Sequence, residues 1–390
     1  MTDAAEMQKE TPKQPGQPPH ATVPLKIALA AAAITAVLLF FLTGRGWLDT
    51  IHIIFSVFFA LFGAAVTFLI LRSGRINRYR LPVFVGSGII FTIGFSIEHE
   101  LSQGTLLLTQ AAQSSGNVPI CPITIPFVIP PLVITGKMIF PSTVAALLPV
   151  LVLWLVLILV FGRGWCGWFC FFGWMDQLSA SILKKPLLRL DTVPRWAKLF
   201  PYALLLVLIL VAVMLLFPLY CAALCPLRIL YDPPMVTTNA GWGLALIFII
   251  GGFILFFAGP FLTKKRIQCS CFCPLIPANA IIGVVSPFRV RVDAEKCKKC
   301  YLCVKSCELF AMTKESLEKG GTTFECAKCG KCIDACPHGA LDYYLYTTAV
   351  RVRPWFIALA VSVSVMLLAG FALTVVTFFL TGNIPSVGGS

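Results

Sequence analysis

The segment Cys297-Lys-Lys-Cys300-Tyr-Leu-Cys303-Val-Lys-Ser-Cys307, with its counterpart Cys326-Ala-Lys-Cys329-Gly-Lys-Cys332-Ile-Asp-Ala-Cys336-Pro337, decides the fold of one part of this chain. Both runs have the spacing C-x2-C-x2-C-x3-C. In this spacing the first three thiolates bind one [4Fe-4S] cluster, and the fourth binds the neighbouring cluster. Structural zinc is the alternative, but zinc sites usually take cysteines as two separated pairs. The predicted ligands are Cys297, Cys300, Cys303 and Cys336 for cluster 1, and Cys326, Cys329, Cys332 and Cys307 for cluster 2.

Residues 290–345 resemble the bacterial two-cluster ferredoxins on the strength of these two runs. The repeat extends past the cysteines, since Ala311 follows Cys307 at the same distance as Ala340 follows Cys336. One residue departs from the usual motif, because Glu308 stands where a proline normally follows the fourth cysteine. The resemblance implies a small α+β domain that stores and passes single electrons.

The rest of the chain is too apolar for a soluble protein. Of its 390 residues 58% are hydrophobic and 12% charged, and the mean hydropathy is +0.87, values typical of a protein that lies mostly in a bilayer. We predict an α-helical multi-span membrane protein with the ferredoxin domain inserted in it. Its seven predicted spans are residues 27–42, 51–71, 81–97, 140–161, 202–219, 242–262 and 356–380.

These spans give a domain organisation. Residues 1–24 are polar and rich in proline, which predicts a disordered cytoplasmic tail. Residues 25–286 form the six-span membrane domain, 287–350 the cytoplasmic ferredoxin domain, and 351–390 the last span with an outer tail. The segment 118–136 contains too many prolines for an ordinary spanning helix, so we expect it on the outer face.

Basic residues orient the predicted spans. The chain has 31 Lys and Arg against 17 Asp and Glu, an excess that usually marks cytoplasmic loops in a membrane protein rather than a nucleic-acid site. Alternate loops lie on the same side of the membrane, and one of the two sets of loops holds most of the Lys and Arg. This set includes the loop with the ferredoxin runs. We therefore expect a multi-pass protein of the bacterial inner membrane, with the N-terminus and ferredoxin domain cytoplasmic and the C-terminus periplasmic.

Three further cysteine pairs lie at the ends of predicted spans and share the spacing C-x3-C. They are Cys166 with Cys170, Cys221 with Cys225, and Cys269 with Cys273. Residues four apart project from the same face of a helix, so each pair offers two thiolates to one centre. Cys271 is an additional thiol within the third motif, and its role stays open.

With these motifs the chain resembles the NapH/NosR-type membrane polyferredoxins over most of residues 85–345. The resemblance implies that the six paired cysteines are functional, although Phe171 replaces the proline of the first motif. Topology places Cys166, Cys170, Cys269 and Cys273 at the inner membrane face, where we infer a third cluster. The alternative is that these are buried small apolar residues.

The remaining cysteines fall on the outer side. Cys121, Cys221 and Cys225, with His99 or a water as a fourth ligand, predict an outer-face cluster or copper site. A disulfide between Cys221 and Cys225 is the alternative, since the outer compartment is oxidising.

The favoured function is electron transfer between the cytoplasm or the quinone pool and a redox partner at the outer face, such as a reductase or cytochrome. No catalytic residue or substrate motif is evident. The predicted partners are membrane lipid, that outer redox protein, and a cytoplasmic donor or quinol, with no nucleic acid. An accessory role is the alternative, in which the outer cysteines reduce or deliver copper to a periplasmic metalloenzyme.

The lysines around the ferredoxin runs, namely Lys298, Lys299, Lys305, Lys328 and Lys331, serve solubility and lipid attraction or dock an acidic donor. Trp165, Trp168 and Trp174 fit an aromatic belt.

Overall fold

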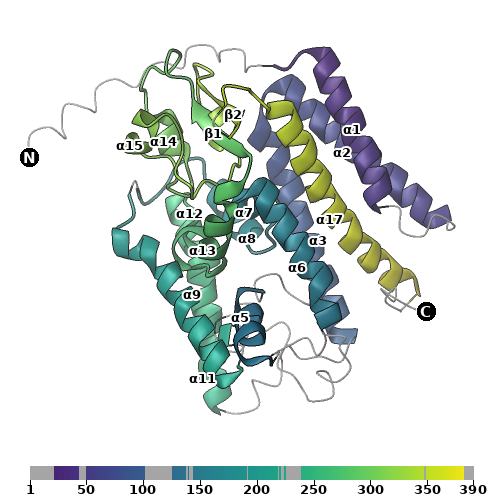
Figure 1. The fold of residues 1–390 in the computed structure, drawn as a ribbon, viewed down its shortest axis with the longest axis vertical. Helices are drawn as coiled ribbons and strands as arrows, with labels where there is room; N and C mark the ends of the chain where they lie inside the picture. Colours follow the sequence, from purple (N-terminus) through teal and green to yellow (C-terminus); the bar gives the residue numbers. More distant parts are fainter. Residues whose placement is uncertain are drawn as a thin grey trace, which may run out of the picture.

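The computed structural model describes residues 22–43, 50–101, 125–137, 139, 144–190, 192–217, 219–220, 224, 239–346 and 348–381. Helices make up most of this part of the chain, and a small antiparallel sheet lies at one end of the molecule (Figure 1). The predicted disordered tail falls almost wholly outside the described residues.

Within the described ranges, four helices are long and apolar enough to cross a membrane, judged by length and composition. They are α1 (Leu25–Thr43), α2 (Thr50–Ser73), α9 (Arg195–Leu215) and α17 (Arg353–Thr381). Each contains an 18-residue window that is apolar on average with at most two charged residues, close to the length that crosses a hydrocarbon core of about 30 Å. Large apolar side chains such as Phe58, Met214 and Phe379 remain exposed on them, as expected for helices that face lipid.

The other three predicted spans also contain helices. Residues 81–97 lie in α3 (Ile76–Leu101), and α6 (Val144–Phe161) covers most of 140–161. Residues 242–262 form α11 (Asn239–Phe253), a π-helical turn η5 (Ile254–Ala258) and α12 (Gly259–Thr263). These three do not meet the length and hydropathy requirement within the described residues, so the count of seven stays a prediction.

The membrane helices form two groups (Figure 1). Helix α17 packs against α1, α2 and α3, while α9 packs against the short helix α5 (Ile125–Thr135). Helix α5 has 11 residues and contains Pro130 and Pro131. At 1.5 Å per residue it is about 16 Å long and cannot cross the core alone, which agrees with the expectation that the proline-rich segment is not a spanning helix.

The sheet places the two cysteine runs side by side. Strand β1 (Phe288–Val292) pairs antiparallel with β2 (Leu341–Leu345), with Val292 opposite Leu341. Because β1 leads into the first run and β2 leaves the second, this register brings Cys297 near Cys336. Three short helices complete the domain, namely α14 (Leu302–Ser306), α15 (Lys314–Glu318) and α16 (Lys331–Asp334).

The backbone of the two runs repeats along with the sequence. Lys299 and Lys328 precede the second cysteine of each run and have φ of 52° and 50°. The residues after that cysteine, Tyr301 and Gly330, have φ of 56° and 79°. Three of these four are not glycine, and such residues rarely adopt the left-handed region. The same constrained loop is therefore built twice.

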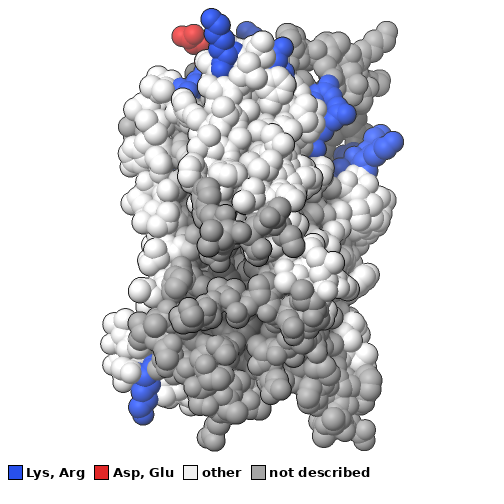
Figure 2. All heavy atoms as spheres, turned by 90° about the vertical axis from the view of Figure 1, so that its right-hand side faces the viewer, with Lys and Arg blue, Asp and Glu red and all other residues white. Residues whose placement is uncertain are grey.

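Four short helices join this domain to the membrane helices (Figure 1). They are α7 (Gly164–Trp168), α8 (Gly173–Ile182), η6 (Gln268–Phe272) and α13 (Leu275–Ile282). On the face shown in Figure 2, most of the Lys and Arg lie toward the end that holds the sheet, with one basic side chain near the opposite end. The cysteine motifs at residues 166–170 and 269–273 lie in this junction.

Candidate iron–sulfur centres

The four cysteines predicted for cluster 1 surround one cavity. Cys297, Cys300, Cys303 and Cys336 all line a partly open space of about 320 Å³. Its other walls include the apolar side chains of Val292, Leu317 and Leu341. Four thiols around a largely apolar space are the donor set of a [4Fe-4S] cluster. Cys300 is the most exposed of the four, so this centre lies nearest to solvent.

The four cysteines predicted for cluster 2 also come together. Cys332 interacts electrostatically with Cys326, Cys329 and Cys307. Burial raises the pKa of Cys326 to about 11, and the nearby Cys329 adds to this rise. Cys332 interacts with Cys303 as well, which places the two ferredoxin sets next to each other.

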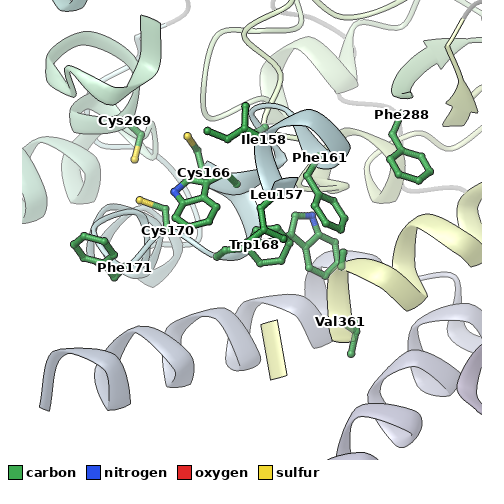
Figure 3. Packing of buried hydrophobic residues seen from close by; sticks show 14 of the residues in the cluster. Leu157, Ile158, Phe161, Cys166, Trp168, Cys170, Phe171, Cys269, Phe288 and Val361 are labelled. Carbon is green, nitrogen blue, oxygen red and sulfur yellow. The ribbon is translucent and has the colours of Figure 1, made fainter. Parts of the chain in front are cut away.

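The third set lies in the junction, and Figure 3 shows the thiols of Cys166, Cys170 and Cys269 pointing toward one another. Cys273 completes it through electrostatic interactions with Cys170 and Cys166. All four are buried. The structure thus joins the first and third membrane motifs, as the predicted topology required, although whether these residues bind a cluster stays a prediction.

The local fold explains this convergence. Helix α6 ends at Phe161, and Gly162 follows with φ of 56°. A Cβ on Gly162 would lie 3.0 Å from the carbonyl oxygen of Gly283, so glycine allows the close approach that turns the chain into α7. Cys166 lies in α7 and Cys170 just after it, while Cys269 is the second residue of the π-helical turn η6.

Cys271 does not belong to this set. It lies between Cys269 and Cys273, and residues two apart in a helical turn project from different faces. Burial raises the pKa of Cys271 to about 11, and its charged neighbours are Asp176, Glu325 and Lys198 rather than the four junction thiols. We therefore assign Cys269 and Cys273 as the pair that faces Cys166 and Cys170.

The junction set fits a cluster by the chemistry of its donors. Burial raises the pKa of Cys170 to about 12, and the Cys166 thiol contributes to the rise. Thiols in such surroundings become thiolates when metal cations share their charge. Within the described residues, no three His, Cys, Asp or Glu side chains converge as a single metal ion requires. A cubane differs because each thiolate binds a separate iron.

Two buried side chains donate hydrogen bonds to the junction sulfurs. Arg266 Nη2 lies 3.2 Å from Cys269 Sγ, and Asn279 Nδ2 lies 3.8 Å from Cys166 Sγ. Both side chains are fully buried. Arg266 Nη2 also donates to the carbonyl oxygen of Cys166 at 2.8 Å. A buried cation this close favours a negatively charged metal–thiolate centre.

Asp176 contacts the backbone of Cys269. Its Oδ2 accepts the backbone N–H of Cys269 at 2.9 Å. Burial raises the pKa of Asp176 to about 7, although the Arg266 guanidinium opposes the rise. The sequence reasoning missed Arg266, Asn279 and Asp176. A polar residue three positions before the Cys269 motif was the only local sign of the first.

Glu308, the departure from the ferredoxin motif, connects cluster 2 to the junction. Its carboxylate is 3% exposed, accepts Gln177 Nε2 at 2.7 Å and pairs with Lys331. Its carbonyl oxygen accepts the backbone N–H of Arg266 at 2.9 Å. Replacing proline with Glu308 therefore attaches the loop of cluster 2 to α8 and to the turn before η6.

Lys328 makes a second connection. Its ammonium donates to the carbonyl oxygen of Phe161 at 2.6 Å and to Ser286 Oγ at 2.7 Å, and its side chain is 3% exposed. Its own carbonyl oxygen accepts Trp168 Nε1 at 3.0 Å. The sequence interpretation of Lys328 as a surface lysine was wrong, because it enters the junction. Lys331 is likewise engaged by Glu308, whereas Lys298, Lys299 and Lys305 are exposed.

The tryptophans of the first motif also differ from the sequence expectation. Trp165 and Trp168 are only 4% and 2% exposed, so neither lies in a lipid-facing aromatic belt. Trp168 instead packs edge-on against Phe356 of α17 with ring centroids 5.9 Å apart. These rings fill the junction between the sheet and the membrane helices.

The structure does not describe the side chains of the predicted outer-face site. Cys121, Cys221 and Cys225 lie outside the described residues, and His99 lies near the end of α3 in a part whose side chains are not described. Tyr220, next to Cys221 in sequence, packs against Phe127 of α5 with ring centroids 5.8 Å apart. The outer-face site stays a prediction.

Comparison with known proteins identifies the cofactor. Residues 143–189 and 199–234 match a family model described as a 4Fe-4S binding domain. Residues 289–337 match one described as a 4Fe-4S dicluster domain. The dicluster match covers all eight ferredoxin cysteines, and the chain carries two [4Fe-4S] clusters there. The first match includes both Cys166/Cys170 and Cys221/Cys225, so by itself it does not distinguish the inner from the outer set.

Several proteins are distantly similar over part of the chain. The "Putative electron transport protein YccM" of Escherichia coli K12 is 28% identical over 52% of this chain. Two uncharacterised proteins of Methanocaldococcus jannaschii, MJ0749 and MJ0750, are 27% identical over 50% and 54% of it. The matches cover 56% of YccM, 69% of MJ0749 and 84% of MJ0750. No solved structure gives a significant match.

Proposed function

We propose that this chain is a membrane-bound iron–sulfur protein that passes single electrons between the cytoplasmic side or the quinone pool and a redox partner at the outer face. The observation that carries the proposal is the succession of three four-cysteine sets. Cluster 1 neighbours cluster 2 through Cys303 and Cys332, and Glu308 attaches the loop of cluster 2 to the junction set. Similarity to YccM, which is named for electron transport, supports the same role.

The residues of the chain do three things in this function. Of the twelve cysteines in the three described sets, eleven are at least partly buried and only Cys300 is exposed, so the protein keeps water from the junction set and leaves one entry point at cluster 1. Arg266 and Asn279 donate to the sulfurs of the junction set. Bound clusters supply reversible one-electron oxidation and reduction. Glu308 and Lys328 hold the ferredoxin domain against the membrane helices.

We further propose that the chain is a NapH/NosR-type polyferredoxin in the bacterial inner membrane. The gathering of Lys and Arg toward the end that holds the sheet (Figure 2) supports a cytoplasmic ferredoxin domain. Seven spans would then leave the N-terminus inside and the C-terminus in the periplasm. An outer-face site at Cys121, Cys221 and Cys225 would end the route. Delivery of copper to a periplasmic enzyme is the other outcome of the test below.

Electron transfer across a membrane tests the proposal directly. The protein is reconstituted in liposomes that enclose oxidised cytochrome c, and an impermeant reductant is added outside. The wild type is expected to reduce the enclosed cytochrome, and Cys332→Ser and Cys225→Ser are expected to stop it. Cys271→Ser, which changes a buried cysteine outside the three sets, is the matched control and should retain the rate. Equal rates in wild-type and protein-free liposomes would contradict the electron-transfer role and favour the accessory one.

A further inference from the structure

A basic cavity lies between the ferredoxin sheet and the junction. It is open to solvent, and the empty space inside it and at its mouth totals about 1100 Å³. Five basic residues line it, although the amino group of Lys328 already donates to Phe161 and Ser286, and none of its lining residues is acidic. The five are Arg163, Arg289, Arg291, Lys319 and Lys328. A concave wall of one charge sign concentrates oppositely charged ligands, so the cavity selects for an anion.

Arg163, at the back of the cavity, has hydrogen-bond partners for two of its three guanidinium nitrogens. Arg163 is 3% exposed, and its Nη1 and Nη2 donate to the carbonyl oxygens of Glu325 at 2.6 Å and Cys269 at 3.3 Å. Its Nε has no hydrogen-bond partner, and the same holds for the buried Oγ1 of Thr323, another residue of the lining. Buried polar groups without partners are uncommon in folded proteins. A bound polar ligand is one physical reason for them.

Exposed apolar and aromatic side chains line the front of the cavity. Phe324 and Tyr346 are 58% and 51% exposed, and Val284 is 49% exposed. Arg289 lies over the Tyr346 ring, 5.7 Å from its centroid. Gly320 and Gly321 form part of the wall, and a Cβ on Gly320 would meet nothing within 4 Å. The mouth therefore offers apolar contacts beside the charges, at the level where the ferredoxin domain meets the membrane helices.

We propose that this cavity binds a phosphate group, carried either by an anionic lipid headgroup or by a soluble phosphate compound. Guanidinium groups match phosphate oxygens through paired hydrogen bonds, and three of the five lining cations are arginines. The exposed valine and aromatic rings suit an acyl chain or a flat ring attached to that phosphate. The site adjoins the cluster 2 set through Cys326, but the basic side chains of the lining, not the cysteines, hold the anion.

The position of the cavity couples anion binding to cluster 2. Cys326, a predicted ligand of cluster 2, belongs to the same lining, and Arg163 bonds the carbonyl oxygen of Glu325 next to it. Added negative charge beside a cluster disfavours its reduction, so the bound phosphate lowers the reduction potential of cluster 2. By linkage, oxidation of cluster 2 strengthens binding of the anion. This coupling requires only the two clusters of the ferredoxin domain. It does not depend on the proposed electron transfer to the outer face.

The test measures binding and potential together. The holoprotein is placed in nanodiscs of phosphatidylcholine alone, and inorganic pyrophosphate is titrated by calorimetry against potassium chloride of equal ionic strength. A parallel sample uses nanodiscs with added phosphatidylglycerol. In each, the midpoint potential of the EPR signal that Cys332→Ser removes is measured. A lower potential in the phosphatidylglycerol discs alone identifies a headgroup site, and a lower potential with pyrophosphate identifies a soluble ligand.

A double variant separates the site from general charge. Arg291→Gln with Lys319→Gln should weaken binding about a hundredfold, because each lost charge-assisted contact is worth about tenfold, and should remove the shift in potential. Lys296→Gln with Lys314→Gln removes the same charge from exposed positions outside the cavity lining and should change neither. Unshifted potentials in both wild-type arms, or equal losses in the two double variants, would overturn the proposal. Iron content and EPR intensity establish that each variant is folded, and the wild-type titration is decisive without any variant.

Discussion

Replacing Glu308 with proline tests how the ferredoxin domain is held. The substitution restores the residue usual in the ferredoxin motif, so we expect both ferredoxin clusters to form. Cys307 before it already has an extended backbone with φ of −71° and ψ of 115°, which suits a residue before proline. Among the hydrogen bonds of the described residues, none is donated by the backbone N–H of Glu308. The change therefore removes the carboxylate with little local strain.

The loss follows from the contacts of that carboxylate. Gln177 Nε2 at 2.7 Å would lose a charged acceptor in a buried site, at a cost of about 1.5–3 kcal/mol. Lys331 would lose its partner, but its side chain is 24% exposed and water can replace part of the interaction. Breaking a fully buried pair costs about 3–5 kcal/mol. We place the weakening of the contact between domains at about 2–4 kcal/mol, or roughly thirtyfold to several-hundredfold in the equilibrium for local opening.

Hydrogen exchange followed by mass spectrometry measures how often the contact between the two domains opens. The reporters are amides protected by the contact between domains, those of Ile76 and Asn77, which donate to Asp334 at 2.9 and 2.7 Å. Their exchange should accelerate by the factor above in Glu308→Pro. Glu308→Gln keeps a neutral acceptor for Gln177 and should give a smaller increase, while Glu315→Gln, at an exposed position on α15, should give none. Wild-type exchange in a Glu308→Pro variant with full iron content would refute the role given to this residue.

Three other predictions follow from the same structure. Arg266→Gln removes the cation 3.2 Å from Cys269 Sγ and should lower the midpoint potential of the junction cluster in an EPR redox titration, whereas an unchanged potential would show that the cation does not act on it. Asp334→Asn removes the charge and one of the two oxygens at the start of α3, so exchange at Ile76 and Asn77 should accelerate about tenfold by the usual worth of a helix cap, and no acceleration would mean that the carboxylate is not the cap. Cys221 should resist a membrane-impermeant thiol reagent in intact cells until metal is chelated or disulfides are reduced, and free labelling of untreated protein would exclude both a filled outer site and a disulfide there.

The ferredoxin domain could be predicted from the sequence because its information is local. The cysteine spacing fixes which thiolates share a cluster, and the structure brings both predicted sets together. Long apolar runs likewise located α1, α2, α9 and α17. The prediction that Lys328 lies at the surface rested on its charge and was wrong. Its acceptor, the carbonyl oxygen of Phe161, lies 167 positions away, and nothing near Lys328 in sequence indicates burial.

The junction shows where sequence reasoning stopped. The spacing C-x3-C could pair Cys166 and Cys170 with either remaining motif, and the choice of Cys269 and Cys273 came from topology. Cys271 could not be placed until the π-helical turn showed that it faces away. Glu308 was visible as a departure from the motif, but its partner Gln177 is 131 positions away. Contacts of this kind depend on how the domains meet, which no local pattern records.

The central claim is that the junction holds a third cluster in line with the two of the ferredoxin domain. The most direct test is iron and sulfide analysis with Mössbauer spectroscopy of anaerobically purified wild type, Cys170→Ser and Cys271→Ser. The account predicts that Cys170→Ser loses the iron of one [4Fe-4S] cluster while the Cys303- and Cys332-dependent signals remain, and that Cys271→Ser matches the wild type. A folded Cys170→Ser protein with the iron content and spectrum of the wild type would contradict it.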